Sequence, residues 1–261
     1  MQNIKKIVFG LLILFSTTEL FANSKVTICT DTNFWYPFTF TKNHEAVGLH
    51  IDIISTALRK LGIEPVFKPV SWQQCLMEAK NGTVDAIATA SYRDDRAIYL
   101  NYPEGAATDR KSPWRVTQVE YVVITSALNP KGEKNDYQFT GDVKSIPQPV
   151  RVPSHYSVAE DLRNAGLTVK EGKSSIDDFK KLVKERTGSV VALEEIAEHF
   201  ATQPEFSEKF VVQRRPLNLK SYYLAFSKGG SVKIEEAQRV WQAIANIRED
   251  QKIMGEFLIK Y

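Results

Sequence analysis

Three apolar segments alternate with two helical patterns in the first third of the chain, and this order limits the fold more than any other feature. Residues 25–30 and 64–70 are predicted to be strands, and so are residues 84–89, where Val84 and the run 86–88 are small or branched apolar residues, as in a buried strand. Between them, the helical spacing of apolar residues predicts helices over 51–61 and 72–80. Alternation of this kind is typical of parallel strands joined by right-handed crossovers. The sequence therefore predicts an α/β fold with a mostly parallel sheet.

The third of these strands runs into polar residues. Thr89 and Ser91 follow its apolar part, and Arg96 closes the segment. Open α/β sheets bind ligands at the carboxyl ends of their strands, and a guanidinium suits a carboxylate because it donates two parallel hydrogen bonds. Two interpretations follow from these residues alone. They form a ligand site, or Arg96 is a surface residue paired with Asp94 or Asp95.

Short motifs on both sides of this stretch occur in a characteristic order. They are an aspartate after the first strand, an aromatic-Pro-Phe segment, a G-x-x-x-D motif, a tryptophan, a G-x-x-D motif and an aromatic-Pro pair. They stand at residues 31, 36–38, 48–52, 72, 82–85 and 102–103. Together they resemble the periplasmic solute-binding proteins of the polar amino acid uptake family, which have an arginine at the position of Arg96. The resemblance covers nearly all of the chain after residue 22.

This resemblance implies a two-lobe periplasmic-binding-protein fold of type II, in which each lobe is a mostly parallel sheet flanked by helices. Residues 23–122 and 222–261 are expected to form the first lobe, and residues 123–221 the second, with a hinge between them. The implied ligand is a small molecule, an amino acid or a small carboxylate, which the cleft delivers to an ABC permease of the inner membrane. The protein is expected to be a monomer without a cofactor, located in the periplasm.

The resemblance also assigns ligand-binding roles in the first lobe. Arg96 is expected to hold the ligand carboxylate, with the two hydroxyl residues of the same strand beside it. An aromatic ring is expected over the ligand, and Trp35 and Tyr36 are the candidates because each ring carries a polar handle. The alternative is that these rings fill the core. Asp31 is expected to meet the ligand ammonium or, alternatively, to act as a turn or cap residue.

The second lobe departs from the family at the turn that grips the ligand carboxylate. Where the family has a Gly-Thr-Thr-like turn, this chain has His155, Tyr156 and Ser157, which places a bulky side chain where the backbone should approach closely. Ser157 followed by Glu160 predicts a capping box, and the helix start predicts an anion site, so Tyr156 and Ser157 are expected to bind the ligand. Glu194 stands where many members have an ammonium-binding aspartate. The alternative is an ordinary acidic residue at the start of a helix.

Residues 1–22 have the pattern of a secretory signal peptide. Lys5 and Lys6 precede the apolar run 7–15, and Ala22 offers a small residue for cleavage. The alternative, an uncleaved anchor, is disfavoured because the run is short. Cleavage leaves 32 basic and 30 acidic residues, a balance that gives no reason to expect nucleic acid as a partner.

The two cysteines, Cys29 and Cys75, remain in the chain after cleavage. Export places them in an oxidising compartment, where a pair is usually joined. They lie on the first strand and on the helix after the second strand, which are expected to be neighbours. We therefore predict a disulfide. The alternative is a pair of buried thiols that act as small apolar residues.

The sequence favours binding over catalysis. The four histidines lack metal-site spacing, and no nucleophile elbow, zinc-protease motif or phosphate loop occurs. A second possible function is a periplasmic enzyme, because the fold also resembles that of cyclohexadienyl dehydratases, with His155 or Glu194 as the candidate general acid. A third is a ligand-sensing partner of a receptor.

Overall fold

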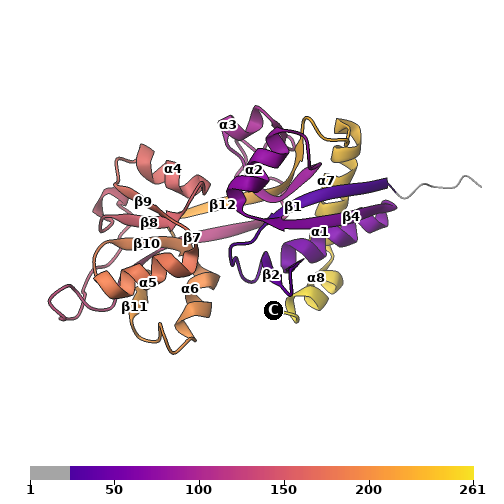
Figure 1. Cartoon of the computed structure of the whole chain (residues 1–261). Coiled ribbons are helices and arrows are strands. Elements are labelled where there is room, and N and C mark those ends of the chain that lie inside the picture. The colour runs from indigo at the N-terminus through magenta and orange to yellow at the C-terminus, as the bar shows by residue number, and fades with distance from the viewer. Residues whose placement is uncertain (1–23) are drawn as a thin grey trace, which may run out of the picture.

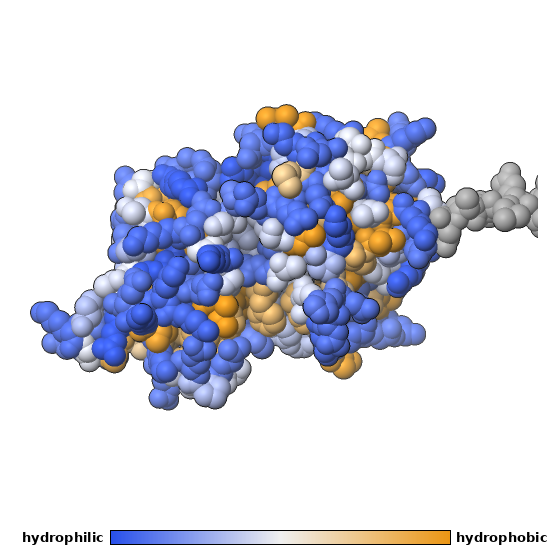
Figure 2. All heavy atoms as spheres, in the orientation of Figure 1, coloured by the Kyte–Doolittle hydropathy of each residue, from blue (hydrophilic) through white to orange (hydrophobic). Residues whose placement is uncertain are grey.

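The computed structural model describes residues 24–261, so the predicted signal peptide lies outside the described residues. Figure 1 shows two groups of helices and strands joined by two long strands, β7 (Thr117–Ser126) and β12 (Asn218–Ser227). Figure 2 shows the same view with all atoms. The face turned toward the reader is mostly hydrophilic, and hydrophobic atoms reach it only in separate small areas. No helix within residues 24–261 is long and apolar enough to cross a membrane.

The first lobe is built on the predicted strand-helix alternation, which the structure confirms. β1 (Ser24–Asp31) pairs in parallel with β4 (Ile63–Val70) on one side and with β5 (Ala86–Ser91) on the other. The crossovers contain α1 (Leu49–Lys60) and α2 (Trp72–Lys80). The carboxyl ends of β1 and β5 therefore meet at one edge of the sheet, where the polar residues of the sequence stand.

The C-terminal segment returns to this lobe. α7 (Ile234–Glu249) packs against α1 and buries Val240, Trp241 and Ile244, which lie at helical spacing. The Trp241 indole Nε1 donates a hydrogen bond to the Leu224 carbonyl at 2.8 Å. The other elements of the lobe are β2 (Phe40–Lys42), β3 (Glu45–Val47), α3 (Asp94–Ala97), β6 (Leu100–Asn101) and α8 (Gln251–Leu258).

The second lobe continues the same sheet. β10 (Ser189–Leu193) pairs antiparallel with β7 and parallel with β8 (Val150–Pro153), and β9 (Val169–Gly172) pairs parallel with β8. Three helices and two short elements complete it: α4 (Ser157–Asn164), α5 (Ser175–Glu185), α6 (Glu194–Ala201), β11 (Phe210–Val212) and the 3₁₀ turn η1 (Val143–Ser145).

The two long strands belong to both lobes. The first half of β12 pairs with β7, and its second half pairs with β5. β7 in turn pairs with β12 through its first half and with β10 through its second half. Tyr121 and Tyr222 lie where these pairings change, and their hydroxyls are 2.6 Å apart. β7 and β12 are thus the two sheet strands that join the lobes.

Cys29 and Cys75 form a disulfide, as predicted, with their Cα atoms 5.6 Å apart. The bond joins β1 to α2, and both cysteines are fully buried beside Ala79 and Ile87. The bond thereby fixes α2 to β1, the strand whose carboxyl end lies at the polar edge of the sheet.

Asp178 is a buried acidic residue of α5 with an unpartnered oxygen. Its Oδ2 has no hydrogen-bond partner, and a Cβ atom at Gly172 would lie 2.0 Å from its Oδ1. Burial raises the pKa of this carboxyl to about 7, although Lys181 and Arg151 act in the opposite direction. The charged form of Asp178 is therefore unfavourable in the folded protein.

We expect Asp178→Asn to stabilise the protein at pH 8 and to have little effect at pH 4. Because the folded pKa is raised above 3.8, the unfolded chain ionises first as the pH rises, and stability is lost between about pH 4 and the folded pKa of about 7. The gain should be roughly 1–2 kcal/mol, since the amide keeps a buried polar group. Urea unfolding at both pH values measures it. Asp177→Asn controls for the helix dipole, and an equal gain at both pH values would contradict the explanation.

Candidate functional site

The candidate site is a cavity between the lobes at the carboxyl ends of β1 and β5. Seven of the nine predicted ligand-binding residues line it: Asp31, Trp35, Thr89, Ser91, Arg96, Tyr156 and Ser157. The space open to the centre of a water molecule is about 30 Å³, which suits about two waters. A ligand of amino acid size therefore requires the lobes or the lining side chains to move.

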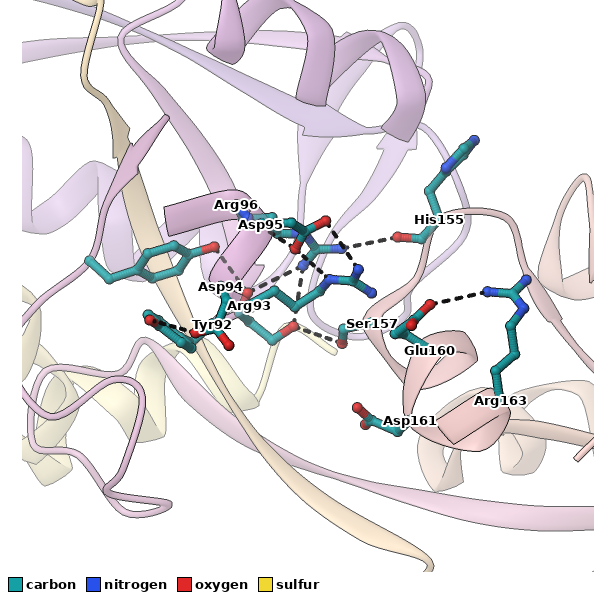
Figure 3. A network of polar contacts seen from close by, with 12 residues as sticks. Tyr92, Arg93, Asp94, Asp95, Arg96, His155, Ser157, Glu160, Asp161 and Arg163 are labelled. Atoms are coloured by element: carbon teal, nitrogen blue, oxygen red, sulfur yellow. Dashed lines mark hydrogen bonds and ion pairs between the residues drawn. The ribbon is translucent and has the colours of Figure 1, made fainter. Parts of the chain in front are cut away.

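Arg96 lies between the lobes and is only 3% exposed. Its Nη1 donates to the Ser91 carbonyl at 3.2 Å and to the Ser91 hydroxyl at 3.3 Å, while Nη2 donates to the His155 carbonyl at 3.0 Å (Figure 3). The guanidinium carbon also lies 5.2 Å from the Trp72 ring centroid. Arg96 therefore joins the end of β5 to the start of α4.

The alternative of a surface ion pair for Arg96 is wrong. Asp95 pairs with Arg93, whose Nε lies 2.8 Å from Asp95 Oδ1, and Asp94 accepts a hydrogen bond from the Tyr92 hydroxyl at 3.1 Å. Within residues 24–261, no carboxylate forms a salt bridge with the Arg96 guanidinium. Arg96 thus brings a positive charge into the cavity that no neighbouring side chain neutralises by direct contact.

His155 keeps the backbone approach that the family makes with glycine. It adopts a left-handed conformation, with φ of 63°, which costs a non-glycine residue some stability. Its carbonyl accepts hydrogen bonds from Arg96 and from Trp72 Nε1, the latter at 3.1 Å. Its ring is exposed and points away from Arg96 (Figure 3). The expected obstruction by a bulky side chain is therefore wrong.

Ser157 does not form the predicted capping box. Tyr156 is the N-cap of α4 without a side-chain cap, and Ser157 is the first helical residue. The Ser157 hydroxyl instead accepts from Ser91 Oγ at 2.8 Å and from Lys220 Nζ at 3.0 Å, while Glu160 forms a salt bridge with Arg163. The hydroxyl bonds across the cleft because helix α4 begins directly opposite the end of β5.

Tyr156 reaches from the second lobe to the end of β1. Its hydroxyl donates to Asp31 Oδ2 at 2.9 Å and accepts from Asn33 Nδ2 at 2.8 Å. The Asn33 backbone N–H donates to Asp31 Oδ1 at 3.0 Å. Burial raises the pKa of Asp31, and burial raises the pKa of Tyr156 well above its usual value. Asp31 is thus held by groups of the protein itself.

The structure leaves Tyr36 and Glu194 outside the cavity lining. The aromatic segment divides, because Trp35 faces the cavity and packs against Tyr222, with ring centroids 4.7 Å apart. Tyr36 lies outside the cavity. Its ring centroid is 5.0 Å from that of His199, and its hydroxyl donates to the Tyr261 carbonyl. Glu194 is a half-buried residue that begins α6.

Four lining residues lie outside the set predicted from the sequence: Thr39, Trp72, Ala88 and Tyr222. Trp72 is one of the motifs of the family resemblance, so the sequence did contain a signal for it. Tyr222 stands on β12, and only the pairing of β12 with β5 brings it to the cavity. Trp72 and Tyr222 add aromatic surface, which makes the walls largely apolar around Arg96.

His50 supports two of the lining hydroxyls from behind. It is fully buried in α1, and its Nδ1 lies 3.2 Å from Thr39 Oγ1 and 3.1 Å from Thr89 Oγ1. Burial lowers the pKa of His50 to about 3, so the imidazole is neutral near pH 7. Gly48 permits this placement, because a Cβ there would lie 2.3 Å from the Phe38 carbonyl oxygen.

Comparisons with known proteins agree with this geometry. The profile of the bacterial extracellular solute-binding proteins, family 3, matches residues 26–254. A comparison with curated proteins gives no match.

Among solved structures, the chain is similar to a histidine kinase sensor domain with similarity to periplasmic binding proteins, with a TM-score of 0.72, 15% identity, and coverage of 91% of this chain and 95% of that chain. It is similar to an ancestral arginine-binding protein bound to glutamine, with a TM-score of 0.68, 17% identity and coverage of 91% and 97%. It is also similar to the arginine-, lysine-, histidine-binding protein ArtJ from Geobacillus stearothermophilus, with a TM-score of 0.67, 17% identity, and coverage of 91% of this chain and 95% of that chain. At these identities the similarity shows the fold, which is the two-lobe periplasmic-binding-protein fold of type II.

Proposed function

Because this chain belongs to the bacterial extracellular solute-binding proteins, family 3, we propose that it captures an amino acid or a small carboxylate between its lobes. The observation that carries this proposal is the position of Arg96, a nearly buried cation on the cavity wall with the hydroxyls of Ser91 and Ser157 beside it. A guanidinium in such surroundings favours a carboxylate, because charge-assisted hydrogen bonds strengthen when water is excluded.

We further propose that residues 23–122 and 222–261 form one rigid lobe and residues 123–221 the other. Both boundaries fall inside β7 or β12, the strands that the lobes share. Direct hydrogen bonds across the cleft, from Ser91 to Ser157 and from Arg96 to the His155 carbonyl, favour a closed state. Rotation about the two strands then opens and closes the cavity.

Delivery to an ABC permease from the periplasm is the role we propose, as a monomer that uses no cofactor. Family membership and the amino-acid-binding similar structures support it. A sensing role is the second candidate, and the similar sensor domain supports it. Catalysis is disfavoured because the two candidate acids are badly placed: the His155 ring points away from Arg96, and Glu194 does not line the cavity.

A thermal-shift screen tests the binding proposal. Amino acids and small organic acids are added to the purified protein, and at least one class should raise the melting temperature. A ligand at a hundred times its Kd stabilises the folded state by about 2.7 kcal/mol. Small-angle scattering with the same ligand should then show a smaller radius of gyration, because closure brings the lobes together.

Two results would count against this function. The first is that neither class of compound raises the melting temperature at millimolar concentration. The second is that a compound that binds leaves the scattering profile unchanged. The first result would contradict ligand binding, and the second would indicate a rigid cavity in place of a hinge.

A further inference from the structure

The hydroxyl of Tyr156 contacts the acidic residue of the cavity, Asp31. Asp31 lines the cavity and Asn33 lies next to it in the same turn, and the Tyr156 hydroxyl bonds to both, at 2.9 and 2.8 Å. With the Asn33 backbone N–H on the other carboxylate oxygen, both oxygens of Asp31 accept from protein donors. A ligand ammonium placed here has to displace the phenol or share its acceptor.

The two charges of the cavity are not equally free to bind a ligand. Among the described lining residues, Asp31 is the only acidic one and Arg96 the only basic one. A second cation stands behind the lining, because Lys220 Nζ donates to the Ser157 hydroxyl at 3.0 Å and also pairs with Asp161. Within residues 24–261 the Arg96 guanidinium uses three of its five N–H groups on Ser91 and His155, so N–H groups remain for a ligand, whereas both oxygens of Asp31 already accept hydrogen bonds.

An ammonium group gains little in such a cavity. Both oxygens of Asp31 already accept hydrogen bonds, from the Tyr156 hydroxyl and from the Asn33 backbone N–H. The rings of Trp35, Trp72 and Tyr222 also line the cavity, and such rings cannot replace the water lost by an ammonium group as a carboxylate would. Burying a charge without a partner is costly.

We propose that Tyr156 makes the cavity selective for carboxylates that lack an α-ammonium group, so that the ligand is an organic acid with an apolar body rather than an α-amino acid. This inference rests on the proposed binding function and chooses between its two ligand classes. Arg96 holds the carboxylate, the aromatic rings hold the body, and the phenol takes the place of the amine.

Matched pairs of compounds that differ only in the amino group test this selectivity. The pairs are propanoate and L-alanine, 4-methylpentanoate and L-leucine, and 3-phenylpropanoate and L-phenylalanine, each measured by titration calorimetry. In the unmodified protein, the acid of at least one pair should bind at least tenfold more tightly than its amino acid. Both members of a pair require the same closure, so the ratio of their Kd values is independent of the energy of closure.

Tyr156→Phe removes one oxygen and frees Asp31 Oδ2, while the Asn33 amide keeps its hydrogen bonds with Ser175. The ratio of Kd values should then move by about tenfold or more toward the amino acid, because an ammonium can form a charge-assisted hydrogen bond with Asp31. Tyr92→Phe is the matched control. It removes a tyrosine hydroxyl that donates to Asp94 at 3.1 Å outside this cavity, and it should leave the ratio unchanged. Melting temperatures of both variants establish that they are folded.

The outcomes separate the inference from the function on which it rests. Amino acids that bind the unmodified protein as tightly as their acids overturn the selectivity and leave the binding function intact. The role of Tyr156 is contradicted if Tyr156→Phe leaves the ratio of Kd values unchanged. It is also contradicted if Tyr92→Phe changes that ratio equally. Failure of every probe to bind both the unmodified protein and Tyr156→Phe counts against the function and the inference together.

Discussion

Arg96→Ala is expected to weaken binding of the ligand found by screening by at least tenfold to a hundredfold. A charge-assisted hydrogen bond contributes roughly 1.5–3 kcal/mol, and about 1.4 kcal/mol corresponds to a factor of ten. Arg96→Lys should recover only part of this affinity, because a single ammonium cannot reproduce the planar pair of donors. Titration calorimetry on both variants gives the two ratios.

The stability of the Arg96→Ala variant should change little, and this separates a ligand role from a structural one. The two carbonyls that Arg96 contacts each keep another donor: Tyr102 donates to the Ser91 carbonyl at 3.0 Å and Trp72 to the His155 carbonyl at 3.1 Å. Arg93→Ala is the matched control, since it removes a guanidinium that is paired with Asp95. Affinity within twofold of the unmodified protein, together with a lower melting temperature, would refute the ligand role.

Loss of the disulfide should have the largest effect on stability. The bond joins cysteines 46 positions apart, and closing a loop of that length stabilises a protein by about 4 kcal/mol in the chain-entropy description. The double variant Cys29→Ala with Cys75→Ala should therefore unfold in urea with a free energy lower by about that amount. For a chain of this size, about 2–4 °C of melting temperature is lost for each kcal/mol.

Reduction of the unmodified protein provides the control for this experiment. A reductant should lower the stability of the unmodified protein and leave that of the double variant unchanged, because the variant has no bond to break. Two free thiols in denatured, unreduced protein isolated from the periplasm would contradict the prediction directly. A double variant as stable as the unmodified protein would show that the sheet alone holds α2 in place.

Helices and strands that are long enough to show a periodic pattern of apolar residues could be predicted from the sequence. The sequence predicts α2 over residues 72–80, as observed, because its apolar residues recur at helical spacing. β2, β3 and β6 were missed, since strands of two or three residues have no measurable periodicity. The apolar signal of β12 is confined to its second half, because its first half is partly exposed.

The site was predictable where it depends on a single lobe. Thr89, Ser91 and Arg96 stand together because the end of β5 places them there. The contacts across the cleft were not predictable. Asn33 and Tyr156 are 123 positions apart, and no local pattern says that they touch. The capping-box prediction for Ser157 failed for the same reason, because a local rule competed with a partner on the other lobe.

The position of β12 next to β5 determines the order in which this chain can complete its tertiary structure. A polypeptide emerging from its N-terminus forms β1, β4 and β5 early, but one edge of β5 keeps unpaired N–H and C=O groups until residues 222–226 arrive. Such an open edge favours wrong pairings, and pairings so distant in sequence form slowly. α7, which covers α1, also arrives late. The lobe that begins to fold first is therefore completed last, after the whole of the other lobe has been synthesised.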